Sequence, residues 1–120
     1  MSPRPLVMYV LLRRDLISEL KWPTGAVCAQ VAHVCMSALW RFREDENVLK
    51  YMADSKSMRK VVLEVTDECA LKTMCDQLST ANIDFEPWTE QPENLLTCLA
   101  VKPYPKDKVQ PLLRHLKLFA

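Results

Sequence analysis

The sequence holds a single glycine, Gly25, among its 120 residues. A phosphate-binding loop of the Gly-rich kind needs several glycines, so the chain has no loop of the type that holds nucleoside triphosphates. The Gly-x-Ser-x-Gly turn, which presents a nucleophilic serine, is excluded for the same reason. The scarcity of glycine therefore removes two of the common ways in which an α/β protein builds a reactive centre.

Paired ligands for a metal or a disulfide are also lacking. The five cysteines include no Cys-x-x-Cys pair, and the two histidines do not stand at zinc-ligand spacing. An odd number of cysteines without a paired pattern is typical of reduced, mostly buried thiols. We expect no disulfide, no metal site and no cofactor. The cysteines are Cys28, Cys35, Cys69, Cys75 and Cys98.

Long hydrophobic runs and a strong charge excess are missing as well. The longest apolar stretch near the amino end, Leu6 to Leu12, is too short for a membrane span or for a signal peptide with its cleavage region. We therefore expect a cytoplasmic protein without membrane contact. The net charge of +1 shows no basic excess of the kind that marks nucleic-acid binders. Hydrophobic residues make up 49% of the chain, which fits a globular domain and allows a homodimer.

Hydrophobic periodicity and turn signals divide the chain into four strands and four helices. Pro5 to Leu12 is a nearly continuous apolar run, which predicts a central strand buried on both faces. The element order favours a mixed sheet with helices on both sides, because strand-helix-strand units form right-handed crossovers. We expect a single compact α/β domain over residues 1–120, built as three α/β/α layers. The other expected elements are a helix from Pro23 or Thr24 to about Phe42 after a polar connection at 13–22, a helix at 45–53, a strand at 60–65, a helix from 66–68 to about 82, a strand at 83–89 that Pro87 limits to an edge or bulge, a strand at 97–101, and a helix at 106–116 interrupted at Pro111.

The first long helix has an unusual polar pattern. Thr24 is placed to cap its amino end with the side-chain hydroxyl. Farther along, the only polar residues between positions 26 and 39 are Gln30, His33 and Ser37, and their spacing puts them on one face. We expect this face to form a narrow polar ridge while the rest of the helix is buried.

The amino end of this helix is the strongest candidate for a binding site. It follows the carboxyl end of the central strand, which is where open α/β sheets usually bind ligands. The free N–H groups of a helix start also favour an anion. Gly25 would let a ligand approach closely, and it would equally let the helix pack closely against a neighbouring element.

The segment Gly-x-Val-x-Ala-Gln-Val-Ala-His at residues 25–33 resembles the first-helix signature of the type II (archaeal and eukaryotic) peptidyl-tRNA hydrolase family. Further similar segments are Arg-Arg-Asp-Leu at 13–16, Arg-Lys-Val-Val-Leu-Glu-Val-Thr-Asp-Glu at 59–68 and Thr-Cys-Leu-Ala-Val at 97–101. The resemblance covers nearly the whole chain and is closest to the divergent peptidyl-tRNA hydrolase domain-containing proteins. It implies a four-stranded mixed sheet and hydrolysis of the ester that joins a peptide to the ribose of tRNA.

The chain departs from the family pattern at several positions. Thr24 and Ala26 stand where typical members carry lysines on both sides of the glycine. The loop after the third strand is shorter and lacks the family's Gly-Arg-Thr. Counting forward from that strand puts Glu90 at the position of the family's active-site aspartate, whereas counting backward from Thr97 would put Phe85 there. We prefer the forward count because it retains a carboxylate.

Ester hydrolysis needs an activated water, a stabilised oxyanion and a protonated leaving oxygen. Glu90 and His33 are the candidate acid-base pair, and Thr97, which matches a threonine of the family, is the third candidate catalytic residue. The candidate residues for binding the tRNA acceptor end are Thr24, Gly25, Gln30, Arg14 and Lys21.

Each candidate also has a structural interpretation. His33 can be a core histidine, Gln30 a helix-packing residue and Glu90 a loop charge. Two functions therefore follow from the sequence. The first is a peptidyl-tRNA hydrolase without metal or cofactor. The alternative is a weak or inactive member of the fold that binds RNA or a protein, as the missing lysines would allow.

Overall fold

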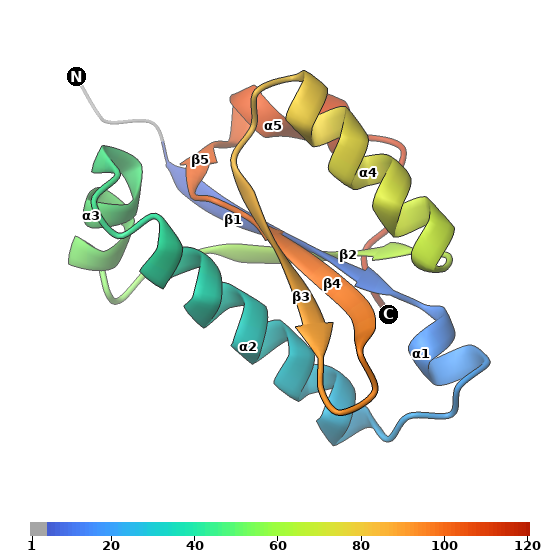
Figure 1. The fold of residues 1–120 in the computed structure, drawn as a ribbon. Coiled ribbons are helices and arrows are strands. Elements are labelled where there is room, and N and C mark those ends of the chain that lie inside the picture. Colours follow the sequence, from blue (N-terminus) through green and yellow to red (C-terminus); the bar gives the residue numbers. More distant parts are fainter. Residues whose placement is uncertain (1–4) are drawn as a thin grey trace.

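The strand β1 (Leu6–Arg13) lies at the centre of the sheet in the computed structural model, which describes residues 5–120 (Figure 1). It pairs in parallel with β2 (Lys60–Val65) and antiparallel with β4 (Leu95–Val101). The strand β3 (Phe85–Glu90) pairs with β4, which gives the order β2-β1-β4-β3. The predicted mixed sheet is confirmed, and Pro87 lies on an edge strand as expected. The first four residues of the predicted domain 1–120 lie outside the described residues.

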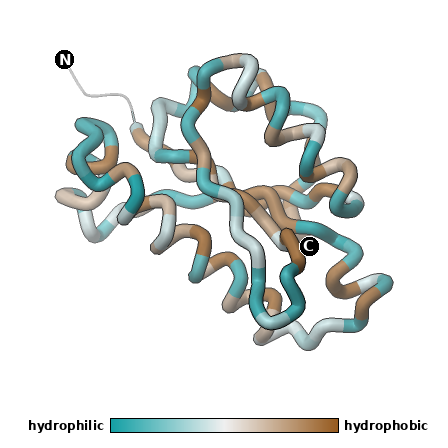
Figure 2. Tube along the Cα trace, viewed as in Figure 1, coloured by the Kyte–Doolittle hydropathy of each residue, from teal (hydrophilic) through white to brown (hydrophobic). Residues whose placement is uncertain are grey.

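Helices cover both faces of the sheet, which confirms the three layers. Alternate residues of β1 face opposite layers because successive strand side chains point to opposite sides. Val7, Tyr9 and Leu11 belong to the core that includes residues of α4 (Glu68–Thr80) and α5 (Lys106–Leu113). Met8 and Val10 belong to the core that includes residues of α2 (Thr24–Arg41) and α3 (Glu46–Ala53). Figure 2 shows apolar colour gathered where the central strands cross, with a hydrophilic tip on the β3–β4 hairpin.

Two elements were not predicted. The polar connection after β1 contains a one-turn helix, α1 (Asp15–Ser18), whose Leu16 is fully buried. A two-residue strand, β5 (Tyr104–Pro105), pairs antiparallel with the start of β1 and adds a fifth strand to the four that were expected. Both are too short to leave a periodic pattern in the sequence.

Two details of the helices were predicted wrongly. Thr24 does not cap α2, because the helix begins at Thr24 itself and the extended residue before it is Pro23, so no side chain caps this end. Pro111 does not interrupt the last helix but lies inside α5, which ends two residues later at Leu113. Because only two helical residues follow Pro111, the missing backbone N–H affects only the end of the helix. By contrast, Asp45 does cap α3, since its carboxylate accepts the N–H of Asn47 at 2.8 Å.

A buried cation joins the sheet to the start of α3. Lys102, just after β4, donates to Asp45 at 2.6 Å and to Asp84 at 3.0 Å. Burial by itself would lower the pKa of Lys102, but the hydrogen bonds to the two aspartates raise it above its ordinary value. This cluster fixes α3 and the start of β3 against the end of β4.

The predicted polar ridge of α2 is confirmed only at His33, which stays exposed, because the ridge runs along the β3–β4 hairpin and Gln30 is buried there while Ser37 is half-buried. Gln30, His33 and Ser37 all meet the β3–β4 hairpin, whereas Met36 and Trp40 point outward with 76% and 68% of their surface exposed. The spacing shows that the three polar residues share a face, but the position of the hairpin decides what that face contacts. Ser37 donates to Glu86 and Arg41 binds the same carboxylate, so the polar face is bonded along its length.

Candidate active site at the start of α2

The candidate site is built where the first half of α2 packs against β3 and β4 (Figure 1). The polar face of α2 supplies Gln30 and His33, and the hairpin supplies Trp88, Glu90 and Thr97. The chain brings these five residues together from positions more than fifty residues apart in the sequence. Two small residues of α2, Ala26 and Ala29, lie beside Gln30 on this side of the helix.

Gln30 and Thr97 form a buried polar pair. Gln30 is 1% exposed and Thr97 is fully buried. The Thr97 hydroxyl donates to Oε1 of Gln30 at 2.8 Å. This bond satisfies a buried amide oxygen, so it fixes the side-chain orientation of Gln30. Thr97 has no exposed surface, so its contact with the candidate site runs through Gln30.

Glu90 lies at the end of β3 and is held by an indole from its own strand. Nε1 of Trp88 donates to Oε1 of Glu90 at 3.0 Å. This hydrogen bond, followed by one from Gln30, lowers the pKa of Glu90 below its ordinary value of 4.5. Glu90 is therefore ionised at neutral pH, with the Trp88 indole as a donor to its carboxylate.

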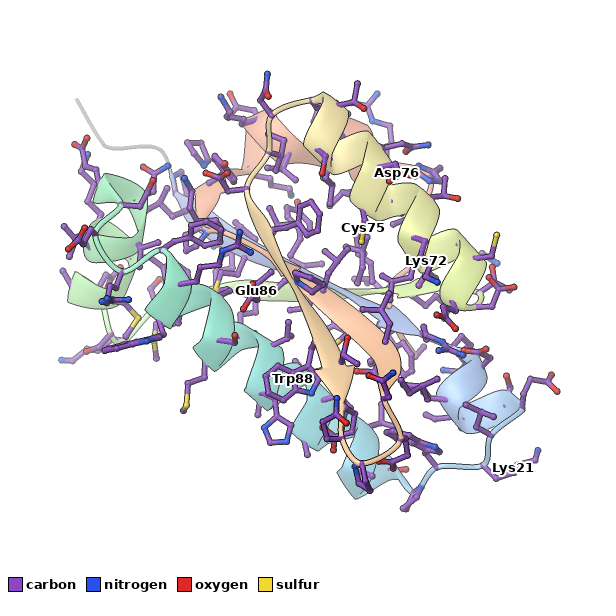
Figure 3. The ribbon with its side chains drawn as sticks, viewed as in Figure 1. Lys21, Lys72, Cys75, Asp76, Glu86 and Trp88 are labelled. Carbon is purple, nitrogen blue, oxygen red and sulfur yellow. The ribbon has the colours of Figure 1, made fainter. Side chains whose placement is uncertain are left out.

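Trp88 also connects Glu90 to His33. The rings of Trp88 and His33 are stacked with their centroids 5.0 Å apart and an interplanar angle of 26°. Figure 3 shows Trp88 pointing from β3 toward α2. The sequence analysis did not identify Trp88 as a site residue. The available signal was the Trp-x-Glu spacing at the end of a strand, because residues two apart share a strand face.

A cavity of about 410 Å³ opens beside these residues at the start of α2. Glu90 and Gln30 line it, together with a second carboxylate, Glu93, from the turn of the hairpin. None of its lining residues is basic, which matches the missing family lysines. The remaining lining residues are Trp22, Pro23, Ala26 and Ala29.

Thr24 and Gly25 are exposed at the first turn of α2, next to the cavity residues Pro23 and Ala26. A Cβ added to Gly25 would have no atom within 4 Å. No packing contact among the described residues therefore requires a glycine here. Of the two interpretations of Gly25, close helix packing is not supported within the chain, and access for another molecule stays a prediction.

The two predicted basic residues lie outside the cavity lining. Arg14 hydrogen-bonds the carbonyl oxygen of Ala120 and stacks over the ring of Phe119. Lys21 donates to the Ser18 carbonyl at 2.9 Å and points away from the sheet in Figure 3. Both side chains stay exposed or half-buried on the α1 side of the molecule, so their role in binding tRNA stays a prediction.

Arg13 is a supporting residue that the sequence analysis missed. Its guanidinium is buried and binds both carboxylate oxygens of Asp15, at 2.9 and 2.8 Å. The same guanidinium donates to the Leu96 carbonyl at 2.8 Å, one residue before Thr97. Arg13 thus joins α1 to the part of β4 that carries Thr97. A buried bidentate pair of this kind is rigid because both planar groups are fixed.

Within residues 5–120, no three His, Cys, Asp or Glu side chains gather in a way that could hold a metal ion. In the same range, no helix combines the length and the apolar character needed to cross a bilayer.

Comparison with known proteins identifies the family. The family model described as Peptidyl-tRNA hydrolase PTH2 matches residues 6–119, so the chain belongs to this family and the resemblance seen in the sequence is confirmed. The mouse protein "Putative peptidyl-tRNA hydrolase PTRHD1" is 44% identical over 119 residues, which are 98% of this chain and 85% of the mouse protein. The human protein of that name is 43% identical over 119 residues, which are 98% of this chain and 85% of the human protein. "Peptidyl-tRNA hydrolase" of Thermococcus onnurineus is 31% identical over 91% of this chain and 93% of the archaeal protein.

Proposed function

We propose that this chain is a peptidyl-tRNA hydrolase, which cleaves the ester between a peptide and the terminal ribose of tRNA. Family membership supports the reaction, and similarity to proteins named for this activity supports the substrate. The observation that carries the proposal is the ionised Glu90, bonded to the Trp88 indole at the wall of a cavity that Gln30 and the start of α2 also line.

In the proposed reaction, Glu90 accepts a proton from a water molecule in the cavity, and the resulting hydroxide attacks the ester carbonyl carbon. Negative charge then develops on the carbonyl oxygen. The N–H groups at the first turn of α2, near Thr24 and Gly25, are placed to stabilise this charge, because the start of a helix has unbonded N–H groups. When the bond to the ribose breaks, the proton held by Glu90 passes to the leaving ribose oxygen, with His33 as the second candidate donor.

Gln30 and Thr97 support this reaction through their position. Gln30 lines the same cavity as Glu90, and the Thr97 hydroxyl fixes the oxygen end of the Gln30 amide. We infer that Gln30 orients the water or the terminal ribose. Thr97 is proposed as a positioning residue, because its side chain is fully buried.

The charge of the cavity lining bears on the rate of hydrolysis. A lysine near the developing oxyanion would stabilise it more strongly than N–H groups alone, and this chain has none in the lining of the cavity. We therefore expect slow hydrolysis, and we expect the variant Ala26→Lys to be faster than the unmodified chain. We also infer a cytoplasmic location, because peptidyl-tRNA is produced by ribosomes.

The test is release of the acyl group from an N-blocked aminoacyl-tRNA by the purified protein. Glu90→Gln is expected to lower kcat by about 10²- to 10⁴-fold, the usual contribution of a general base, with tRNA binding little changed. Glu93→Gln is the matched control, because Glu93 lines the same cavity but is not bonded to Trp88. Equal rates for the two variants would remove Glu90 from the mechanism, and salt-dependent tRNA binding without any release would indicate a binding module instead.

A further inference from the structure

The strand β4 carries an extra residue opposite β3 at the candidate site. Trp88 of β3 pairs with Cys98. The next residue of β3, Thr89, pairs with Leu96 instead of Thr97. Thr97 therefore has no partner of its own in β3 and is the extra residue of a β-bulge. Bulges are common beside active sites, where they redirect a side chain.

The bulge decides which face of the sheet Thr97 occupies. In a regular strand, neighbouring residues point to opposite faces. Thr97 and Cys98 are neighbours, yet both contact Gln30 of α2. The Thr97 hydroxyl donates to Oε1 of Gln30 at 2.8 Å, and the Cys98 thiol donates to the Gln30 backbone carbonyl at 3.5 Å. Leu96 packs on the opposite face, against the core that includes residues of α4. With regular alternation from Cys98, Thr97 would also face α4 and could not reach Gln30.

Arg13 holds the backbone of this bulge. Among residues 5–120, the pairing of β1 with β4 ends at Leu12 and Cys98. The carbonyl oxygen of Leu96 lies past that pair, and it accepts a hydrogen bond from Nη1 of Arg13 at 2.8 Å. Because a buried carbonyl needs a donor, the side chain of Arg13 takes the part that the β1 backbone plays farther along β4.

The guanidinium of Arg13 is itself fixed from two sides. Asp15 accepts hydrogen bonds from Nε at 2.9 Å and from Nη2 at 2.8 Å. Glu68 of α4 lies 3.8 Å from Nη1. The Arg13 side chain is only 6% exposed, so little water competes for these contacts. A planar fork of donors suits this task, because it binds a carboxylate with two atoms and still offers a third nitrogen to the Leu96 carbonyl.

We propose that Arg13 is a positioning residue of the candidate site. By binding the Leu96 carbonyl, Arg13 keeps the bulge that turns the Thr97 hydroxyl toward Gln30, and the hydroxyl in turn orients the Gln30 amide in the cavity. The effect of Arg13 on the rate of hydrolysis rests on the proposed function. Its effect on the orientation of Thr97 and Gln30 does not.

The orientation is tested by NMR of the Gln30 side-chain amide. Arg13→Lys keeps the charge, but a single nitrogen cannot bind Asp15 with two atoms and reach the Leu96 carbonyl as well. We expect the Gln30 amide resonances to move toward the positions that they have in Thr97→Val. In both variants the Thr97 hydroxyl no longer meets Oε1. Gln30 resonances that stay in place in a folded Arg13→Lys protein would overturn the proposal.

Two further variants separate this effect from a general loss of stability. Asp15→Asn is milder, because it leaves Arg13 in place and removes only the charge that fixes the guanidinium. It is expected to move the Gln30 resonances in the same direction by a smaller amount, and no movement would count against the proposal. Lys102→Met is the matched control, since Lys102 is another buried cation with two carboxylate partners. It should destabilise the protein without moving the Gln30 resonances.

The rate is tested with the N-blocked aminoacyl-tRNA. Arg13→Lys is expected to lower kcat as much as Thr97→Val does, on the order of 10²-fold, with KM little changed. The double variant should be no slower than the slower single variant, because both substitutions act through one hydroxyl. Lys102→Met should keep its kcat. Reductions that multiply in the double variant would overturn the proposal. If the unmodified protein releases no acyl group, the proposed function fails, and the Gln30 resonances still decide the role of Arg13.

Discussion

Replacing Thr97 with valine tests the polar pair at the base of the site. Valine has nearly the shape of threonine, so the substitution removes the hydroxyl without opening a cavity. Oε1 of Gln30 then stays buried without the donor that now lies at 2.8 Å. Leaving one buried polar group without its partner costs about 1–3 kcal/mol. We expect Thr97→Val to lower the free energy of unfolding by this amount.

Urea denaturation of the single and double variants isolates the interaction. Gln30→Met in the Thr97→Val background removes the orphaned amide and keeps its length, so part of the lost stability should return, because apolar replacement of both partners can be nearly neutral. The urea dependence of the unfolding free energy should stay unchanged, since the buried surface is similar. A Thr97→Val protein as stable as the unmodified chain, or a double variant that loses the full sum of the two single effects, would refute the pairing.

Two further perturbations test the neighbouring contacts. Trp88→Phe keeps an aromatic ring but removes the N–H group whose hydrogen bond lowers the pKa of Glu90. The pKa of Glu90, measured by carboxyl NMR, should therefore rise toward 4.5. The acid limb of the pH profile of kcat/KM should move to higher pH. A pKa of Glu90 that Trp88→Phe leaves unchanged would contradict this account. Because the native pKa of Glu90 is lowered, the stabilisation from its ionised carboxylate is present above about pH 4.5 and is lost as the pH falls below that value. Lys102→Met should lower the free energy of unfolding by about 1.5–3 kcal/mol, the usual value for hydrogen bonds to charged groups, whereas the exposed control Lys108→Met should change it little. Because the pKa of Lys102 is raised, its contribution is complete below about pH 10.5 and is lost only as the pH rises above that value, so equal unfolding curves for Lys102→Met and Lys108→Met at neutral pH would contradict the assignment.

The sequence predicts the core elements well because their signals are local. β1 is a continuous apolar run that becomes the buried central strand, and Asp45 precedes α3 as its capping residue. The inward direction of the α2 polar face was not predictable in this way. Gln30, His33 and Ser37 meet partners that lie about fifty or more residues later, and only the folded hairpin brings those partners to the helix.

The sequence indicates which end of α2 to consider but not the contacts there. Gly25 and Glu90 led to the start of α2 as the candidate site, and the structure brings Glu90 and Gln30 together at that end, while their catalytic roles stay predictions. The role of Trp88 depends on two contacts at once, one with its own strand and one with α2, and a single sequence pattern shows only the first. Arg13 was missed for a similar reason, since its buried position depends on Asp15 and on the distant Leu96 carbonyl.

The most direct test of the central claim is a comparison of hydrolysis rates for an N-blocked aminoacyl-tRNA at matched concentrations of the unmodified protein, Glu90→Gln and Glu93→Gln. The account predicts acyl release by the unmodified protein and by Glu93→Gln, with release by Glu90→Gln lower by about 10²-fold or more. No release above buffer by the unmodified, folded protein would contradict the proposed function.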